Sequence, residues 1–125
     1  MTRLLVDTHA LLWWLTDDDG LSDTARAALA DPANDVVVST ASVWEIAIKR
    51  GLGKLEAPDD LPEHIEAQGF DWLPVAADHA WRARDLPPHH RDPFDRLLVA
   101  QALTEGMAIV SADARFAAYG VETRW

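Results

Sequence analysis

The residues best able to support chemistry are four acids in unusual surroundings. Asp7 directly follows the aliphatic run RLLV, and Asp113 follows AIVSA. Glu45 lies inside SVWEIAI, a helical segment that is otherwise almost wholly apolar, and Asp95 lies in the first turn of DPFDRLLVAQA. An ionised carboxylate is costly to bury unless it is paired or coordinates a metal. These four acids are therefore candidate ligands of a metal ion.

Each aspartate also has a structural explanation. Asp7 and Asp113 each follow a predicted strand, a position typical of turn and helix-cap residues. Asp95 lies near a helix start, where the helix macrodipole favours negative charge. Asp92 precedes Pro93 and suits the N-cap of the same helix, so a structural and a functional role both remain open for it. A single aspartate would not indicate a site.

Glu45 is harder to explain by local structure. Apolar residues flank it on both sides, so it is exposed only if its helix carries a narrow polar stripe. An ordinary ion pair with Lys49, four residues later, or with Arg50 is the structural alternative.

The elements that must position these acids alternate along the chain. Strands are predicted at 3–7, 35–40, 70–75, 107–113 and 120–125, and helices at 8–15, 22–30, 41–51, 58–69, 77–86 and 93–106. Thr8 is expected to cap the first helix and Ser22 to open the second, while Gly51 and Gly106 are expected to end two later ones. This alternation predicts an α/β fold, with a parallel sheet covered by helices on both faces.

In such sheets, sites form beyond the carboxyl ends of the strands. The ends of two strands and two helix segments can bring the four acids together, and their charges would repel unless a hard cation joined them. Oxygen ligands suit Mg²⁺ or Mn²⁺, which can activate water and stabilise charge on an attacked phosphate. The predicted reaction is metal-assisted phosphodiester hydrolysis.

Composition narrows the class of protein. The 125 residues suit one domain, expected to span residues 1–125, and the absence of cysteine excludes disulfides and thiolate metal sites. A formal net charge of -10 argues against a non-specific nucleic-acid binder, although a bound cation can still bring phosphate to an acidic site. No apolar run is long enough for a membrane span, so we expect a cytoplasmic protein without membrane contact.

Rival chemistries lack their motifs. The chain has no phosphate-binding P-loop, no nucleophile elbow and no H-E-x-x-H zinc motif, and its five histidines lack zinc spacing. His89 and His90, in a proline-flanked loop, are expected to be ordinary surface histidines, with substrate contact as the alternative.

Four blocks resemble one known family in order and spacing. LLVDTHALLWWL, STASVWEIAIKRGLGKL, HRDPFDRLLVAQA and IVSADARFAAYGV are similar to PIN-domain proteins, and more closely to VapC-type toxins of bacterial type II toxin–antitoxin pairs. The resemblance runs from Leu4 to about Val121. It implies a three-layer α/β/α fold with a central five-stranded parallel sheet, and a Mg²⁺- or Mn²⁺-dependent endoribonuclease, a hydrolase of RNA phosphodiester bonds.

The resemblance also implies roles for individual residues. The family's acidic quartet corresponds to Asp7, Glu45, Asp95 and Asp113. Asp7 and Asp95 are expected as metal ligands, Glu45 as a ligand or as the group that orients or activates water, and Asp113 as completing the site directly or through water.

Supporting positions follow from the same resemblance. Thr8 and Ser111 correspond to the family's hydroxyl positions and are expected to support ligands or a metal-bound water. Asp92 is an additional acid whose role the resemblance leaves open.

Partners are implied as well. Family membership implies a cognate VapB-like antitoxin that docks in a groove and blocks the site, a homodimer, a heterotetramer or larger assembly with the antitoxin, and tRNA or another structured RNA as substrate. We expect either Trp13 or Trp14 to line the antitoxin groove or a dimer contact, because both indoles of one helix cannot point inward. Coverage of both within the monomer is the alternative.

Two other functions compete. A phospho-receiver domain also clusters acids at strand ends, but it needs a lysine near its last strand, and Lys49 and Lys54 are the only lysines here. A PIN-like RNA-binding or interaction module with little or no nuclease activity would keep the fold without the chemistry. The apparently intact acids argue against this second alternative.

Overall fold

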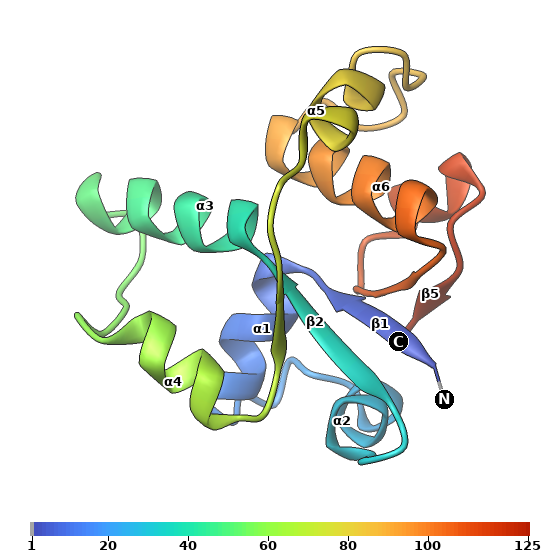
Figure 1. Ribbon diagram of the computed structural model, residues 1–125. Coiled ribbons are helices and arrows are strands. Elements are labelled where there is room, and N and C mark those ends of the chain that lie inside the picture. Colours follow the sequence, from blue (N-terminus) through green and yellow to red (C-terminus); the bar gives the residue numbers. More distant parts are fainter. Residues whose placement is uncertain (1) are drawn as a thin grey trace.

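A five-stranded parallel sheet forms the centre of the molecule. The computed structural model describes residues 2–125 and orders the strands β3-β2-β1-β4-β5 (Figure 1). The strands are β1 (Arg3–Val6), β2 (Asp35–Ser39), β3 (Asp71–Leu73), β4 (Ala108–Val110) and β5 (Thr123–Arg124), and every neighbouring pair is parallel. The predicted α/β class and the five-stranded parallel sheet are therefore confirmed.

Helices cover both faces of this sheet, which gives the three expected layers (Figure 1). They are α1 (Thr8–Leu15), α2 (Asp23–Ala30), α3 (Thr40–Gly51), α4 (Leu61–Ala67), α5 (Ala77–Ala83) and α6 (Pro93–Glu105), with a 3₁₀ helix η1 (Ala114–Tyr119). None of the helices within residues 2–125 is long and apolar enough to cross a membrane.

Two apolar clusters fill the spaces between the layers. On one face, Leu4 and Val6 pack with Leu11 of α1 and Ile65 of α4. On the other face, buried side chains of the sheet pack with those of α6 and η1: Leu5, Val37, Leu98, Val99 and Phe116. Successive residues of β1 thus serve opposite faces, as the two-residue period of a strand requires. Because β1 is the middle strand, both clusters depend on it.

Several helix caps agree with the prediction, but helix bounds differ: α4 lies inside the predicted range 58–69, and α5 ends at Ala83 instead of residue 86. Ser22 caps α2 through its side chain, and Gly106 ends α6 with a left-handed φ of 67°. The prediction that Thr8 caps α1 is wrong: the cap is Asp7, whose carboxylate accepts the Ala10 N–H, and Thr8 is the first helical residue. Gly51 lies within α3 instead of following it.

The dependence of both apolar clusters on β1 predicts a large effect of truncation there. Leu5→Ala should lower the free energy of unfolding by about 2–5 kcal/mol, because Leu5 is fully buried and a cavity would remain. Leu52→Ala removes the same atoms from a side chain that is 65% exposed, so it should change stability by less than about 0.5 kcal/mol. Urea unfolding of both variants measures the difference, and equal losses would contradict the assignment of the core.

Candidate metal centre

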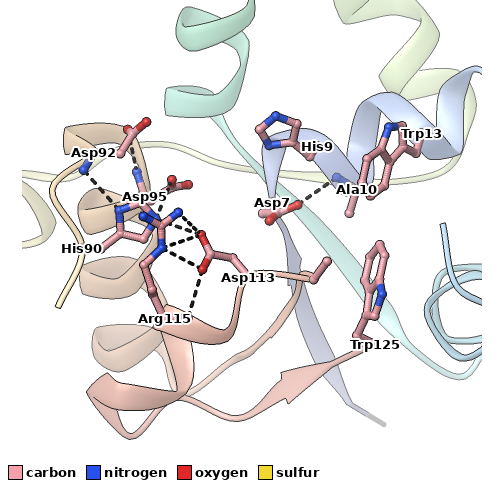
Figure 2. A pocket seen from close by; sticks show the side chains of 11 residues that line it. Asp7, His9, Ala10, Trp13, His90, Asp92, Asp95, Asp113, Arg115 and Trp125 are labelled. Carbon is pink, nitrogen blue, oxygen red and sulfur yellow. Dashed lines mark hydrogen bonds and ion pairs between the residues drawn. The ribbon is translucent and has the colours of Figure 1, made fainter. Parts of the chain in front are cut away.

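The acids meet in one cavity at the carboxyl end of the sheet (Figure 2). It has a volume of about 410 Å³, within the ~300–1,000 Å³ typical of ligand pockets. Its lining comes from the ends of β1 and β4, from α1, the start of α6, the loop before α6, the start of η1 and residue 125: Asp7, His9, Ala10, Trp13, His90, Asp92, Asp95, Ala112, Asp113, Arg115 and Trp125. Three of the four predicted acids line this cavity, and Glu45 does not.

Asp7 is held between strand and helix at the base of the cavity. Its backbone N–H donates to the Val110 carbonyl of β4, and its Oδ1 accepts the Ala10 N–H at 2.8 Å. The residue is only 6% exposed. Burial raises the pKa of Asp7, while hydrogen bonds from the Ser111 side chain and the Ala10 N–H act in the opposite direction. Ser111 thus supports Asp7, in the position where a supporting hydroxyl was expected.

Asp95 lies in the first turn of α6, close to a second acid. Asp92 is the N-cap of that helix, and its Oδ1 accepts the backbone N–H groups of Phe94 and Asp95. Asp92 therefore has the capping role, and it also lines the cavity. Burial, followed by the charges of Asp92 and Glu45, raises the pKa of Asp95 to about 7. Near neutral pH, Asp95 is therefore close to half protonated.

Asp113 differs from Asp95 because cationic and donor groups surround it. It is the N-cap of η1, and the Arg115 guanidinium donates to both of its carboxylate oxygens, at 2.8 Å to Oδ2. The Arg115 hydrogen bonds, with smaller help from His90, hold the pKa of Asp113 well below its usual range. Asp113 is consequently ionised wherever the protein is folded near neutral pH.

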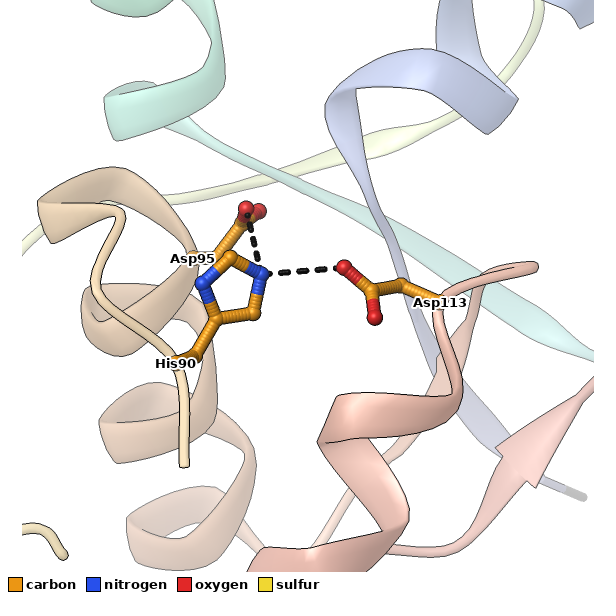
Figure 3. Close-up of side chains that lie close together, drawn as sticks. All are labelled: His90, Asp95 and Asp113. Carbon is orange, nitrogen blue, oxygen red and sulfur yellow. Dashed lines mark hydrogen bonds and ion pairs between the residues drawn. The ribbon is translucent and has the colours of Figure 1, made fainter. Parts of the chain in front are cut away.

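His90 connects these two carboxylates and was missed by the sequence reasoning (Figure 3). Its side chain is 3% exposed, so the expectation of a surface histidine is wrong. Nε2 lies 2.9 Å from Asp113 Oδ2 and 3.1 Å from Asp95 Oδ2, while Nδ1 accepts the Asp92 N–H at 3.2 Å. Because Nδ1 accepts a hydrogen bond, the proton of a neutral ring lies on Nε2. His90 is therefore a donor between the two acids.

The loop before α6 holds His90 in this position. Arg96 donates to the carbonyls of Ala83, Leu86, Pro87 and His90. The Tyr119 hydroxyl of η1 accepts the His90 N–H at 2.8 Å and donates to the Pro87 carbonyl. From the sequence, a histidine next to an arginine in a proline-flanked loop is expected to be exposed to solvent. The hydrogen bonds of Arg96 and Tyr119 that hold this loop involve its backbone atoms, and the sequence does not show which backbone atoms a side chain will reach.

Glu45 lies beside the cavity, in a buried network of its own. It is 2% exposed, its Oε1 accepts from Thr8 Oγ1 at 2.6 Å, and its Oε2 lies 2.6 Å from Lys49 Nζ. The ion pair with Lys49 that the sequence left open is therefore formed, and Thr8 supports Glu45 instead of Asp7. Glu45 still influences the cavity, because its charge helps to raise the pKa of Asp95.

The donor atoms of the cavity suit a hard divalent cation. Carboxylate oxygens of Asp95 and Asp113, with His90 Nε2, lie within 4.8 Å of one another, and Asp7 faces the same space. Oxygen donors match Mg²⁺ or Mn²⁺. The Asp92 N–H occupies the lone pair of His90 Nδ1, so His90 can orient the carboxylates, and the three aspartates are the residues that could hold an ion.

The neighbouring tryptophans of α1 have separate surroundings. Trp14 packs against Phe70 with ring centroids 5.9 Å apart, and its indole N–H donates to Gln68. Trp13 packs against Trp125 and lines the cavity. Both are half-buried, so neither is wholly covered. A contact of either one with an antitoxin or a second subunit stays a prediction.

The opposite pKa shifts of Asp95 and Asp113 predict opposite effects on stability. Folded Asp95 keeps a proton that the unfolded chain loses above its ordinary pKa of 3.8, so the free energy of unfolding falls as pH rises from about 4 to 7. Asp95→Asn removes this cost and should raise the free energy of unfolding by on the order of 2 kcal/mol at about pH 8.

Asp113→Asn is the matched comparison in the same cavity. Its lowered pKa means that the ionised form stabilises the fold above the ordinary pKa, so this variant should be less stable than the wild type near neutral pH. Chemical denaturation in excess EDTA measures both variants without metal. Equal signs for the two substitutions would contradict the electrostatic arrangement.

Comparisons with known proteins agree with the fold and the sequence blocks. Among solved structures, VapBC2 from Rickettsia felis bound to a DNA fragment from their promoter has a TM-score of 0.70 at 11% identity, over 98% of this chain and 97% of that one. FitAcB from Neisseria gonorrhoeae has a TM-score of 0.57 at 16% identity, over 96% of this chain and 95% of that one. At such identities the likeness shows the fold alone.

Sequence comparison goes further. Ribonuclease VapC22 of Mycobacterium tuberculosis is 30% identical over 122 residues, which cover 92% of this chain and 90% of that protein. Ribonuclease VapC16 of the same organism is 38% identical over 69 residues, or 52% of this chain and 47% of that protein. The PIN domain family profile matches residues 4–122. The chain therefore belongs to the PIN-domain family, and within it to the VapC type, as its four sequence blocks predicted.

Proposed function

We propose that this protein is a divalent-metal-dependent endoribonuclease, formed by a single PIN domain over residues 1–125. The observation that carries the proposal is the convergence of Asp7, Asp95 and Asp113 on one cavity of about 410 Å³. Burial raises the pKa of Asp7 and of Asp95, and for Asp95 the charges of Asp92 and Glu45 add to this effect, so a cation in the cavity would favour the ionised carboxylates. The ribonuclease names of the two relatives support RNA as the substrate.

The proposed mechanism assigns a task to each group. Asp7, Asp95 and Asp113 would hold Mg²⁺ or Mn²⁺, which supplies an activated water and stabilises charge on the attacked phosphate. Asp95, whose pKa is raised to about 7, would give up its remaining proton to hold a cation. The Arg115 guanidinium, with its side chain 60% exposed at the cavity, contacts a phosphate oxygen of the substrate.

Glu45 and the residues around it keep a proposed supporting role. Thr8 and Lys49 engage both carboxylate oxygens of Glu45. Glu45 therefore contributes to orienting water indirectly, through this hydrogen-bond network and through the effect of its charge on Asp95. Ser111 orients Asp7 and Asp113, because its Oγ accepts the Asp113 N–H at 2.9 Å and its side chain hydrogen-bonds Asp7.

The aspartates provide the test of the reaction. Asp7→Asn and Asp95→Asn should each reduce Mg²⁺- or Mn²⁺-dependent cleavage of RNA by about 100-fold or more, because each removes a charged ligand. Asp19→Asn, in an exposed turn, makes the same chemical change outside the cavity and should leave cleavage unchanged. Gel analysis of cellular RNA with purified protein provides the measurement.

Two outcomes would count against the proposal. Undiminished cleavage in excess EDTA would exclude the metal-dependent reaction. A folded protein that neither cleaves RNA nor gains melting temperature at millimolar Mg²⁺ or Mn²⁺ would favour the PIN-like interaction module, since a bound cation should relieve the carboxylate repulsion.

We also propose that the protein is the toxin of a type II pair, located in the cytoplasm and inhibited by a VapB-like antitoxin. The VapC names of the relatives support this partner, and a net charge of -10 suits a basic antitoxin segment. Coexpression with the adjacent small reading frame should yield a complex that does not cleave RNA, whereas the chain alone should form a homodimer. Native mass spectrometry gives both stoichiometries, and an active complex would contradict the inhibitory role.

A further inference from the structure

We propose that Trp13 and Trp125 form a stacking subsite for one unpaired base of the RNA substrate, beside the scissile phosphate. The inference rests on the proposed nuclease function and adds a substrate class to it: RNA in which a base next to the cleaved bond is single-stranded or splayed out of its helix.

The first support is the shared cavity. Trp13 and Trp125 line the same space as Asp7, Asp95 and Asp113, and Figure 2 places the indoles and the Asp95–Asp113 pair on opposite sides of Asp7. A phosphodiester at the acids therefore has an aromatic wall within the same cavity. Aromatic side chains recognise unstacked RNA bases by offering a flat apolar face.

The second support is the rigid arrangement of the two rings. Their centroids lie 5.8 Å apart with planes at 51°, so the rings brace each other at an angle instead of covering each other's faces. Both rings pack on the apolar core. Close packing at Gly20 holds Trp13 from behind, since a Cβ there would lie 3.1 Å from the indole. A fixed ring loses little conformational freedom when a base stacks on it.

The third support comes from the other tryptophans. Trp14 and Trp72 donate their indole N–H groups to Gln68 and Glu66. Trp13 and Trp125 are half-buried, yet their N–H groups have no acceptor within residues 2–125. The exposed Trp44 and Trp81 likewise have no acceptor, but they lie outside the cavity, so Trp13 and Trp125 are the tryptophans that line it with an unengaged N–H.

The fourth support is the charge of the protein. A net charge of -10 repels an RNA backbone, so this chain does not gain affinity from the broad phosphate attraction that basic proteins use. Stacking is independent of net charge and is the main alternative source of affinity for single strands. An aromatic subsite would therefore provide affinity for RNA that the negative surface potential does not provide.

Direct binding tests the subsite. In an Asp95→Asn background, which prevents cleavage, fluorescence anisotropy with labelled 12-residue single strands of poly(U) or poly(A) and with a matched duplex gives the dissociation constants. Trp13→Leu and Trp125→Leu should each weaken single-strand binding roughly tenfold, within the range measured for base stacking on aromatic rings. Trp13→Phe keeps a ring and should stay within about threefold.

Trp81→Leu is the matched control. Trp81 is 68% exposed on α5, outside the cavity, and Arg84 stacks on its ring. Its loss should leave binding unchanged. Because leucine at position 13 or 125 could disturb folding, the melting temperature of each variant is measured, and the abasic-substrate experiment with the wild-type enzyme keeps the proposal falsifiable if a leucine variant unfolds.

Cleavage gives an independent test in the otherwise wild-type enzyme. A single abasic substitution, moved along a cleaved RNA, should raise KM at one position next to the cut bond, and Trp13→Leu should abolish this position dependence. The subsite proposal would be overturned if both leucine variants bound single strands as tightly as the protein with both tryptophans. It would also be overturned if duplex and single strand bound with equal affinity. Metal-dependent cleavage that survives this result leaves the nuclease proposal intact. Normal stacking without any cleavage would overturn the nuclease proposal alone.

Discussion

The mutual repulsion of carboxylates in a partly closed cavity is the constraint on which the rest of this structure depends. Asp7, Asp92, Asp95 and Asp113 line one space, and burial together with the charges of the neighbouring acids raises the pKa of Asp95. The fold offsets this repulsion locally. Asp7, Asp92 and Asp113 are the N-caps of α1, α6 and η1. Backbone and side-chain N–H groups at these helix starts therefore donate to each of the three carboxylates.

The donors and cations that offset the carboxylate charges are distributed unevenly across the cavity. Asp113 has Arg115 and His90, Asp7 has Ser111 and a backbone donor, and Asp95 lies nearest to uncompensated charge. A site in which Asp95 has a proton to release and Asp113 is ionised is prepared to exchange that proton for a cation. As a result, ionised Asp113 stabilises the fold, whereas ionised Asp95 destabilises it.

Much of this arrangement follows from the sequence, because strand and helix periodicity fixes the order of elements and parallel strands share one carboxyl edge. Asp7, Asp95 and Asp113 were accordingly found together. Glu45 lies outside the cavity because its carboxylate is bound by Lys49 of the same helix and by Thr8 of α1. His90 is buried because the loop that carries it is held by hydrogen bonds to its carbonyls. The Glu45–Lys49 pair follows from four-residue helix spacing, whereas the Thr8 hydrogen bond to Glu45 and the loop contacts around His90 come from tertiary packing.

The anchoring of the loop before α6 has an evolutionary consequence. Arg96 joins three carbonyls of that loop, and the Ala83 carbonyl at the end of α5, to the helix that carries Asp95, so loop and helix behave as one rigid unit. An insertion or deletion there would be transmitted directly to the acids. The opposite wall, which Trp13 and Trp125 line, lies outside this unit, so a change there is not transmitted through the Arg96 hydrogen bonds.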